Sequence, residues 1–422
     1  MQVCPEAVSL PIKLPMPSAE NSTGGPTLGR LLKLMLLLWL AGVAMRMTIL
    51  AMPPVIPQVH AELHMSETEV GLLIGLPLAM FAIAAVPGSL LIARIGVGVA
   101  IILGMVIAAI AGAARAAAVD VGTLYLASVV TGFGVAIMQP GLPTLVRDWL
   151  PRQMALGTIA YTSGMLMGAS FPPVLTIPYV LPLVGDSWRL DLVAWAVPAL
   201  LIAPVFFLLS PKGDDHGSAG KTVGGRWWPD FKNPLIWLLG LTFGCNNSPY
   251  FATNAFLGDY LATLHKSELL GPALGWLNGS QILALAVLLV MANRYQGRAW
   301  PFLLFGPVLL AAFLVMILAP SAFGIVGSAA LIGFTTAITL TATLALPPLL
   351  CAPGDVPRTA AGMFTVSYTC AIVIPTISGA LWDVTGIPWT AFIPPSLCAV
   401  ALTLLGFTVT RFPAYSEKVP GG

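Results

Sequence analysis

The sequence contains little charge. Asp, Glu, Lys and Arg make up only 9% of its 422 residues, whereas soluble domains carry about 25%. Hydrophobic residues make up 57% of the chain, and the mean hydropathy is +0.90. The apolar residues form continuous runs instead of short alternating segments, which excludes a transmembrane β-barrel. We therefore predict an all-α polytopic membrane protein that is embedded in the lipid bilayer.

Several chemical signatures are also absent. The five cysteines lie far apart, without the spacing of a disulfide framework or a zinc site, and are expected to pack as small apolar residues. No phosphate-binding loop, HExxH motif or GxSxG motif occurs. The net charge of +2 is too small to indicate nucleic acid as a partner. We expect no enzyme activity, no cofactor, no metal and no ATP-driven pumping.

Twelve apolar runs are long enough to cross a bilayer, which requires about 20 such residues. The predicted spans are 31–55, 70–92, 97–117, 120–144, 153–182, 189–209, 234–261, 271–292, 299–319, 322–349, 358–383 and 387–410. The longest polar stretch divides them six and six. Two six-helix bundles related by an axis along the membrane normal define the major facilitator architecture.

This division predicts five segments along the chain. They are a disordered tail (1–30), an N-terminal six-helix bundle (31–210), a linker (211–232), a C-terminal six-helix bundle (233–411) and a short tail (412–422). Pro, Ser, Gly and Thr dominate the first tail, which has no apolar core of its own. We expect the protein to act as a monomer.

Positive charge predicts the orientation in the membrane. With an even number of spans, both chain ends lie on one side, and nearly all Lys and Arg fall on that side. The opposite side carries only Arg115, Arg189 and Lys266, and Arg46 falls within a span. The positive-inside rule then places both termini in the cytoplasm and the protein in the inner (plasma) membrane.

Arg46 is a charge within an apolar run. At about 1.5 Å per residue it lies about 20 Å beyond Lys33, close to the predicted membrane midplane. A guanidinium costs at least about 2.5–3.5 kcal/mol there, so it should face the protein interior or a wet cavity. Asp191, Asp259 and Asp383, the nearest acids, fall near the outer ends of their spans. Arg46 is therefore an anion anchor or, alternatively, a structural residue paired within the protein.

Other polar side chains occur at membrane depth. Asn247, Tyr250 and Asn254 recur at three- and four-residue spacing in the seventh span, so they could share one helix face. Similar cases in other spans are Gln139, Tyr161, Gln281 and Tyr368. Such groups must be satisfied, either by a substrate in a cavity or by hydrogen bonds between helices. We name all seven as candidate substrate-binding residues beside Arg46.

A few motifs have mainly structural interpretations. Ser66 and Glu69 form a capping box at the start of the second span. The threonines of Thr335–Thr343 are expected to bond back to their own helix. His60 and His64 lie one helical turn apart in the first outer loop, where two imidazoles could bind a metal, although a solvated loop is the preferred interpretation.

Prolines are expected to break three of the spans. They are Pro53, Pro54 and Pro57 in the first span, Pro140 and Pro143 in the fourth, and Pro172 and Pro173 in the fifth. Breaks beside a cavity allow the halves to rock, although prolines in membrane helices often only shape packing.

The positions of these residues also match a known family pattern. An Arg precedes a Pro-rich exit from the first span, and glycines precede a polar residue and a proline in the fourth. The matching residues are Arg46, Pro53, Pro54, Pro57, Gly71-Leu72-Leu73, Leu76-Pro77, Arg115, Gly132, Gly134, Gln139, Pro143, Tyr161, Gly362, Pro375, Gly379, Asp383, Thr385-Gly386 and Trp389. In this pattern the chain resembles the cyanate and 2-nitroimidazole porter family of major facilitators, with Gln139 in the place of an expected Asn.

The resemblance implies a gating loop as well. Gly88, Arg94 and Gly96 match the loop between spans 2 and 3 that latches the cytoplasmic side of facilitators. Ala93 stands where the pattern has Asp, so the latch is expected to be looser.

Three functions are weighed. The first is a secondary active or facilitative transporter of a small anionic solute, cyanate-like or organic, that works by alternating access around Arg46. The second is efflux of neutral or weakly acidic aromatic compounds such as nitroimidazole-type drugs. A ligand-sensing membrane protein is the third, disfavoured because the chain has no appended soluble domain. Proton-coupled facilitators usually carry a titratable carboxylate within a span, and none is central in this sequence. Facilitated diffusion and symport of an anion with a proton therefore both stay open.

Overall fold

The computed structural model describes residues 28–83, 85–211, 229–290, 297–351 and 355–411. Within these ranges the regular secondary structure is entirely helical, which confirms the predicted all-α class. The two predicted tails and most of the linker 211–232 lie outside the described residues, except that the first helix already begins at Leu28.

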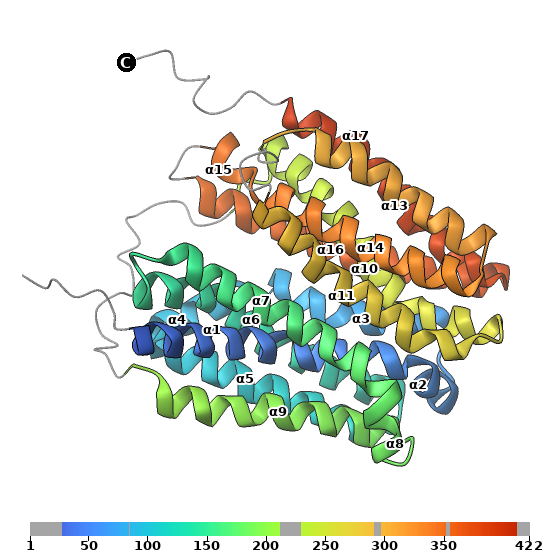
Figure 1. Cartoon of the computed structure of the whole chain (residues 1–422), viewed down its shortest axis with the longest axis horizontal. Helices are drawn as coiled ribbons and strands as arrows, with labels where there is room; N and C mark the ends of the chain where they lie inside the picture. Colours follow the sequence, from blue (N-terminus) through green and yellow to red (C-terminus); the bar gives the residue numbers. More distant parts are fainter. Residues whose placement is uncertain (1–27, 84, 212–228, 291–296, 352–354, 412–422) are drawn as a thin grey trace, which may run out of the picture.

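The first half of the chain forms one group of helices, drawn blue to green in Figure 1. Its elements are α1 (Leu28–Leu50), η1 (Pro53–Val55), α2 (Ile56–Leu63), α3 (Glu67–Ile83), α4 (Ala85–Ile95), α5 (Val97–Ala114), η2 (Arg115–Ala117), α6 (Val121–Trp149), α7 (Met154–Leu175), η3 (Thr176–Val180), α8 (Leu181–Leu183) and α9 (Trp188–Leu209). We call this group the N-terminal half.

The second half of the chain, yellow to red, forms the other group, which we call the C-terminal half (Figure 1). Its elements are α10 (Pro234–Thr263), η4 (Ser267–Leu269), α11 (Leu270–Val290), α13 (Trp300–Leu318), α14 (Ala322–Leu344), α15 (Pro347–Leu350), α16 (Val356–Thr385), η5 (Pro388–Phe392) and α17 (Ile393–Thr410).

Ten helical segments of the described chain are long and apolar enough to cross a membrane. They coincide with ten of the twelve predicted spans. The other two predicted spans, 70–92 and 234–261, correspond to α3 with α4 and to α10, whose asparagines reduce its hydropathy.

Two ends of the molecule are useful landmarks. The terminal end is where α1 begins and α17 ends, on the left of Figure 1, and the His60 end is the opposite one, with α2 and α8. The halves meet where α3 packs on α16, α7 on α11, and α10 on α2. Among the described residues, no hydrogen bond or ion pair joins the halves nearer to the terminal end than that of Gln139 with Tyr368.

Glycines allow the close contacts that hold this arrangement. A Cβ atom at Gly164 of α7 would lie 2.1 Å from the Trp39 carbonyl oxygen of α1, so the two backbones touch directly. Between the halves, a Cβ atom at Gly71 of α3 would lie 2.4 Å from the Pro375 carbonyl oxygen of α16. Larger residues at these positions would push the helices apart.

Proline ends one helix but not the others. α1 stops at Leu50, just before Pro53 and Pro54, as predicted. The prediction that Pro140 and Pro143 break the fourth span was wrong, because α6 runs through both. A membrane helix tolerates an internal proline when neighbouring groups satisfy the freed carbonyls. α7 likewise passes its two prolines and ends only at Leu175, where η3 follows as a π-helical segment.

Local predictions on capping and threonine are confirmed. The Ser66 amide donates to Glu69 Oε2 at 2.8 Å, and the Glu69 amide donates to Ser66 Oγ at 3.2 Å, which is a capping box. The α14 threonines donate to carbonyls of their own helix, as Thr343 does to Thr339 at 2.8 Å. Cys245 and the three other described cysteines form no disulfide.

Candidate substrate site between the two halves

Arg46 lies on α1 and is partly exposed within the protein. Within the described residues it has no hydrogen bond and no carboxylate within the 4.0 Å distance of an ion pair. Its charge nevertheless acts on the phenol of Tyr250, which belongs to α10 in the other half. Arg46 therefore faces the interface between the two halves without a protein counter-charge.

Tyr250 is the centre of a polar cluster opposite Arg46. Its hydroxyl donates to Asn278 Oδ1 at 2.5 Å, and Asn254 Nδ2 donates to the Tyr250 carbonyl at 2.9 Å. Gln281 also lies beside the phenol. Two buried atoms of this cluster, Asn254 Oδ1 and Gln281 Nε2, have no hydrogen-bond partner among the described residues. Unsatisfied buried polar groups are costly, so a bound solute or water is expected to complete them.

A hydrogen bond between Gln139 and Tyr368 joins the two halves. Gln139 Nε2 of α6 donates to the Tyr368 hydroxyl of α16 at 3.1 Å. The Tyr368 ring lies edge-on against Phe81 of α3, with centroids 5.0 Å apart, and contacts Phe243 and Phe364 of its own half. These predicted site residues therefore lie between the halves, in an aromatic setting.

Two other predicted residues have their described contacts outside the Tyr250 cluster. Asn247 Nδ2 donates to Ser367 Oγ at 2.9 Å, so this side chain joins α10 to α16 inside the C-terminal half. Tyr161 belongs to α7 at its close contact with α1, where a Cβ atom at Gly42 would lie 2.2 Å from the Tyr161 carbonyl oxygen. Among the described contacts, neither residue reaches Arg46 or Tyr250.

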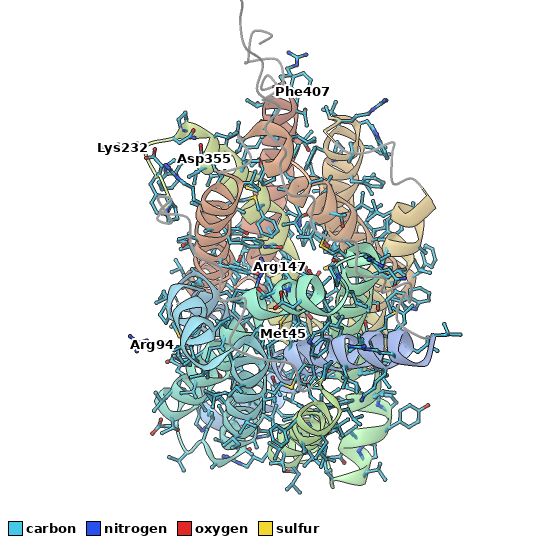
Figure 2. All side chains as sticks on the ribbon, turned by 90° about the vertical axis from the view of Figure 1, so that its left-hand side faces the viewer. Met45, Arg94, Arg147, Lys232, Asp355 and Phe407 are labelled. Atoms are coloured by element: carbon cyan, nitrogen blue, oxygen red, sulfur yellow. The ribbon has the colours of Figure 1, made fainter. Side chains whose placement is uncertain are left out.

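The predicted gating loop lies at the terminal end. Gly88 of α4 faces α6, where a Cβ atom would lie 3.3 Å from the Ala136 carbonyl oxygen. Gly96 has a φ of +85°, the left-handed backbone that favours glycine, and it separates α4 from α5. Arg94 projects from the edge of the molecule in Figure 2 and forms no ion pair with any described residue. Its latching role therefore stays a prediction.

Arg115 is a buried cation that sequence reasoning placed only at the end of a span. It is 1% exposed, and its Nη1 donates to the Thr48 carbonyl of α1 at 3.1 Å. Its Nε and Nη2 atoms have no partner in the described part of the chain. Because α1 ends at Leu50, the carbonyls of its last turn lack helical donors, and Arg115 supplies one.

Asn278 was also missed. It is 1% exposed and lies three residues before Gln281 on α11, which places both amides on one helix face. The signal was present, because an amide inside an apolar run is the criterion that selected Gln281.

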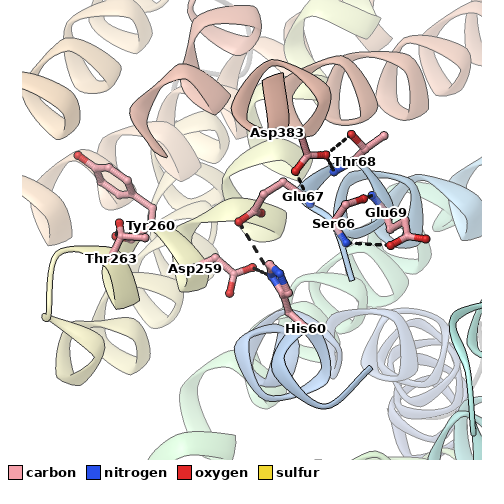
Figure 3. A network of polar contacts seen from close by, with 9 residues as sticks. All are labelled: His60, Ser66, Glu67, Thr68, Glu69, Asp259, Tyr260, Thr263 and Asp383. Carbon is pink, nitrogen blue, oxygen red and sulfur yellow. Dashed lines mark hydrogen bonds and ion pairs between the residues drawn. The ribbon is translucent and has the colours of Figure 1, made fainter. Parts of the chain in front are cut away.

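The His60 end carries an ionic cluster that joins the two halves (Figure 3). His60 Nδ1 of α2 lies 3.0 Å from Asp259 Oδ2 of α10 and 4.0 Å from Glu67 Oε1 of α3. The expectation that His60 lies in a solvated loop was wrong, since this imidazole is half-buried and bonded across the halves, whereas His64 ends α2 in a left-handed conformation.

This cluster is also the described group whose geometry comes nearest to a metal site, with its donor atoms within 4.8 Å of one another. The contact between His60 and Asp259 is a hydrogen bond, however, and a metal ion would have to displace its proton.

The sequence profile of the Major Facilitator Superfamily matches residues 34–295. This chain belongs to that superfamily. The facilitator is 25% identical over 388 residues to the cyanate transport protein CynX of Escherichia coli (strain K12), a match that covers 90% of this chain and 98% of CynX. It is also 25% identical over 217 residues to the uncharacterized transporter YycB of Bacillus subtilis (strain 168), which covers 51% of this chain and 53% of that protein.

Solved structures show the same fold. A bacterial homolog of the human lysosomal transporter Spinster, in an inward-facing and unoccupied conformation, has a TM-score of 0.68 at 17% identity and covers 92% of this chain and 97% of its own. The nucleoside transporter NupG, solved as a point mutant, has a TM-score of 0.69 at 14% identity, covering 89% and 99%. The facilitator is thus a multi-pass membrane protein of a transporter superfamily.

Proposed function

We propose that this facilitator transports a small anionic solute by alternating access, with Arg46 as the anion anchor between the halves. The observation that carries the proposal is the state of Arg46. Its charge acts on Tyr250 of the other half, yet no described carboxylate or carbonyl pairs with it. A guanidinium at membrane depth needs a counter-charge, and an anionic solute supplies one.

The neighbouring groups suit a small planar anion. A guanidinium offers a rigid fork of donors that holds carboxylate-like or delocalised anions in a bidentate way. Gln281 Nε2 adds a neutral donor without a protein partner among the described residues, and the Tyr250 phenol lies beside it. Cyanate is the first solute to test, because the relative CynX is a cyanate transport protein.

The orientation forms part of the same proposal. The excess of Lys and Arg at the terminal end indicates that this end faces the cytoplasm. The described ties between the halves lie toward the His60 end, so the structure corresponds to a state closed to the outside.

The test is uptake into liposomes that contain the purified protein. Cyanate, formate, nitrite, bicarbonate and acetate form the panel. Arg46→Ala is expected to lower uptake of the transported anion about 100-fold, because a charge-assisted hydrogen bond contributes about 1.5–3 kcal/mol. Arg30→Ala is the matched control, since it removes an exposed charge from the same helix and should leave uptake unchanged. Uptake by Arg46→Ala and Arg46→Lys equal to that of the parent for every anion would refute the anchor.

A second candidate is efflux of neutral or weakly acidic aromatic compounds. The rings of Phe81, Phe243 and Phe364 around Tyr368 favour it, because aromatic surfaces stack on aromatic solutes. Under this alternative, cells without the protein become sensitive to nitroimidazole-type drugs, and Arg46→Ala keeps full resistance.

A further inference from the structure

The two halves are tied at the His60 end through a helix N-terminus. Asp383 of α16 accepts hydrogen bonds from the backbone amides of Glu67 at 2.9 Å and Thr68 at 2.8 Å, and from the Thr68 hydroxyl. A carboxylate from the C-terminal half thus caps α3 of the N-terminal half (Figure 3). This tie must break before the halves can separate at that end.

A second tie lies beside the first. His60 of α2 is hydrogen-bonded to Asp259 of α10 at 3.0 Å, again between the halves. Gly379 of α16 approaches the Glu67 carbonyl oxygen of α3 so closely that a Cβ atom would lie 2.1 Å from it. The two helices are therefore in direct backbone contact at this end. Water therefore has little access to the groups enclosed between the two ties.

Glu67 is enclosed there with the His60 imidazole, 4.0 Å from its Oε1 atom, as its nearest basic group. It is 8% exposed, its Oε2 has no hydrogen-bond partner, and no described Lys or Arg lies within ion-pair distance of it. The titratable groups facing it are His60 from α2, Asp259 from α10 and Asp383 from α16. Glu62 and Glu69 are engaged elsewhere, the first with Arg189 and the second with the Ser66 amide.

The surroundings favour a proton on this carboxyl. Glu67 precedes the predicted span 70–92, and burial together with the charge of Asp259 raises its pKa to about 8. If it were ionised, two or three carboxylates would face one imidazole, and Glu67 itself, 8% exposed, would have little contact with water. When the His60 end opens, water reaches the group and its pKa returns toward about 4.3.

We propose that Glu67, together with His60 and Asp259, forms a proton-binding site that is occupied while the His60 end is closed and emptied when it opens. The proposal deepens the proposed function, because it names the proton as the ion that is linked to the transport cycle. It rests on the proposed function in that respect alone. Through this site, the pH of the solution changes the equilibrium between the closed and the open state.

The direction of the pH effect follows from the two pKa values. Glu67 binds a proton below about 8 in the closed state and below about 4.3 in the open state. The closed state is therefore fully favoured below about pH 4.3 and loses that advantage as the pH rises to about 8. Across this interval, one proton shifts the ratio of open to closed molecules up to about tenfold per pH unit.

The experiment measures the opening of the His60 end without any substrate. Spin labels are attached at Ala61→Cys on α2 and Ala262→Cys on α10, which are both exposed positions. Double electron–electron resonance then reports the distance between the two halves. The native cysteines are replaced by alanine, and the fold is checked by thermal unfolding. We expect the open fraction of the parent to rise at least tenfold from pH 6 to pH 8.

Glu67→Gln keeps the shape of the side chain but cannot titrate. We expect this variant to stay closed over the whole range, with less than a twofold change. Glu69→Gln is the control on the same helix and should keep the parent profile. Where Glu67→Gln fails to fold, Asp259→Asn is used, and a weakened pH response with normal thermal unfolding is the expected result.

Three outcomes would overturn the proposal. One is an unchanged pH profile in Glu67→Gln, and another is a parent whose distances do not respond to pH. The third is a closed state that needs added Zn²⁺ and opens with EDTA, since the occupant would then be a cation. Because the labels report opening without solute, a failed anion-uptake assay would refute the proposed function and leave this result standing.

Discussion

Two arginines of the N-terminal half lie in apolar surroundings and have opposite settings. Arg115 is 1% exposed and donates to the Thr48 carbonyl near the end of α1. Arg46, two residues before Thr48 on the same helix, is partly exposed, has no described bond, and lies near Tyr250 of the other half. One guanidinium therefore has a backbone partner, and the other has none among the described residues, which is the basis of the proposed anion anchor.

The largest expected effect is a difference in protein stability between variants of Arg115 and variants of Arg46. Arg115→Ala removes a fully buried side chain and leaves a cavity, so we expect it to lower the free energy of unfolding by about 2–4 kcal/mol. Arg46→Ala should change it by less than about 1 kcal/mol, because no bond is lost. Denaturant unfolding in detergent micelles checks this, and Arg115→Met, which fills the space, should restore most of the loss. Equal stability of both alanine variants would contradict the comparison.

The next effect is a difference in anion uptake when each arginine is replaced by lysine, which keeps the charge but not the planar guanidinium. Arg46→Lys keeps the positive charge but loses the bidentate fork, so anion uptake should fall about tenfold. Arg115→Lys should leave uptake within twofold of the parent once the amount of folded protein is matched. Initial rates of uptake into liposomes measure both. A tenfold loss in Arg115→Lys would show that this buried residue also senses the solute.

A smaller effect tests the cluster opposite Arg46. Asn278→Ala frees the Tyr250 hydroxyl from its bond of 2.5 Å, and we expect about a fivefold rise in the apparent KM for the anion. Asn246→Ala is the matched control, because that buried amide accepts from Thr339 inside the C-terminal half. The control should change stability and leave KM as it is. Identical KM values for parent and Asn278→Ala would remove Tyr250 from the site.

The smallest effect concerns a residue that we expect to be structural. Asn247→Ala should change anion uptake by less than twofold, because its amide is already bonded to Ser367 within the same half. Uptake rates over a range of anion concentrations provide the measurement. A change as large as that of Asn278→Ala would place Asn247 on the transport path after all.

The sequence predicted local features well, but it predicted poorly which side chains of different helices contact each other. The positions of the spans and the Ser66–Glu69 capping box follow from runs and spacings of a few residues, and the structure confirms both. The seven polar candidates beside Arg46 in the prediction divide into three groups. Two contact each other across the interface, three form the Tyr250 cluster of α10 and α11, and two have no described contact with either. Periodicity indicates which residues share a face, but it does not indicate which other helix that face meets.

The ionic cluster shows the same limit. His60 and Asp259 are 199 positions apart, and Glu67 and Asp383 are 316 apart, so no local pattern links them. Each aspartate was recognised as lying near the end of its span. Its partner was not, because the contact exists only after two helix bundles have come together.

The amino-acid sequence alone predicted the positions of the membrane helices, and ten of them are long apolar helices in the described chain. It also predicted that Arg46 lies at membrane depth. The physical reason is that a bilayer requires about 20 apolar residues in succession and penalises each charge among them. The tertiary structure decided which polar groups meet. It bonded Arg115 to a broken helix, left Arg46 without a described partner, and enclosed Glu67 among other acids. These outcomes depend on the packing of α1, α3, α10 and α16, where backbone contacts at glycine set which side chains face each other.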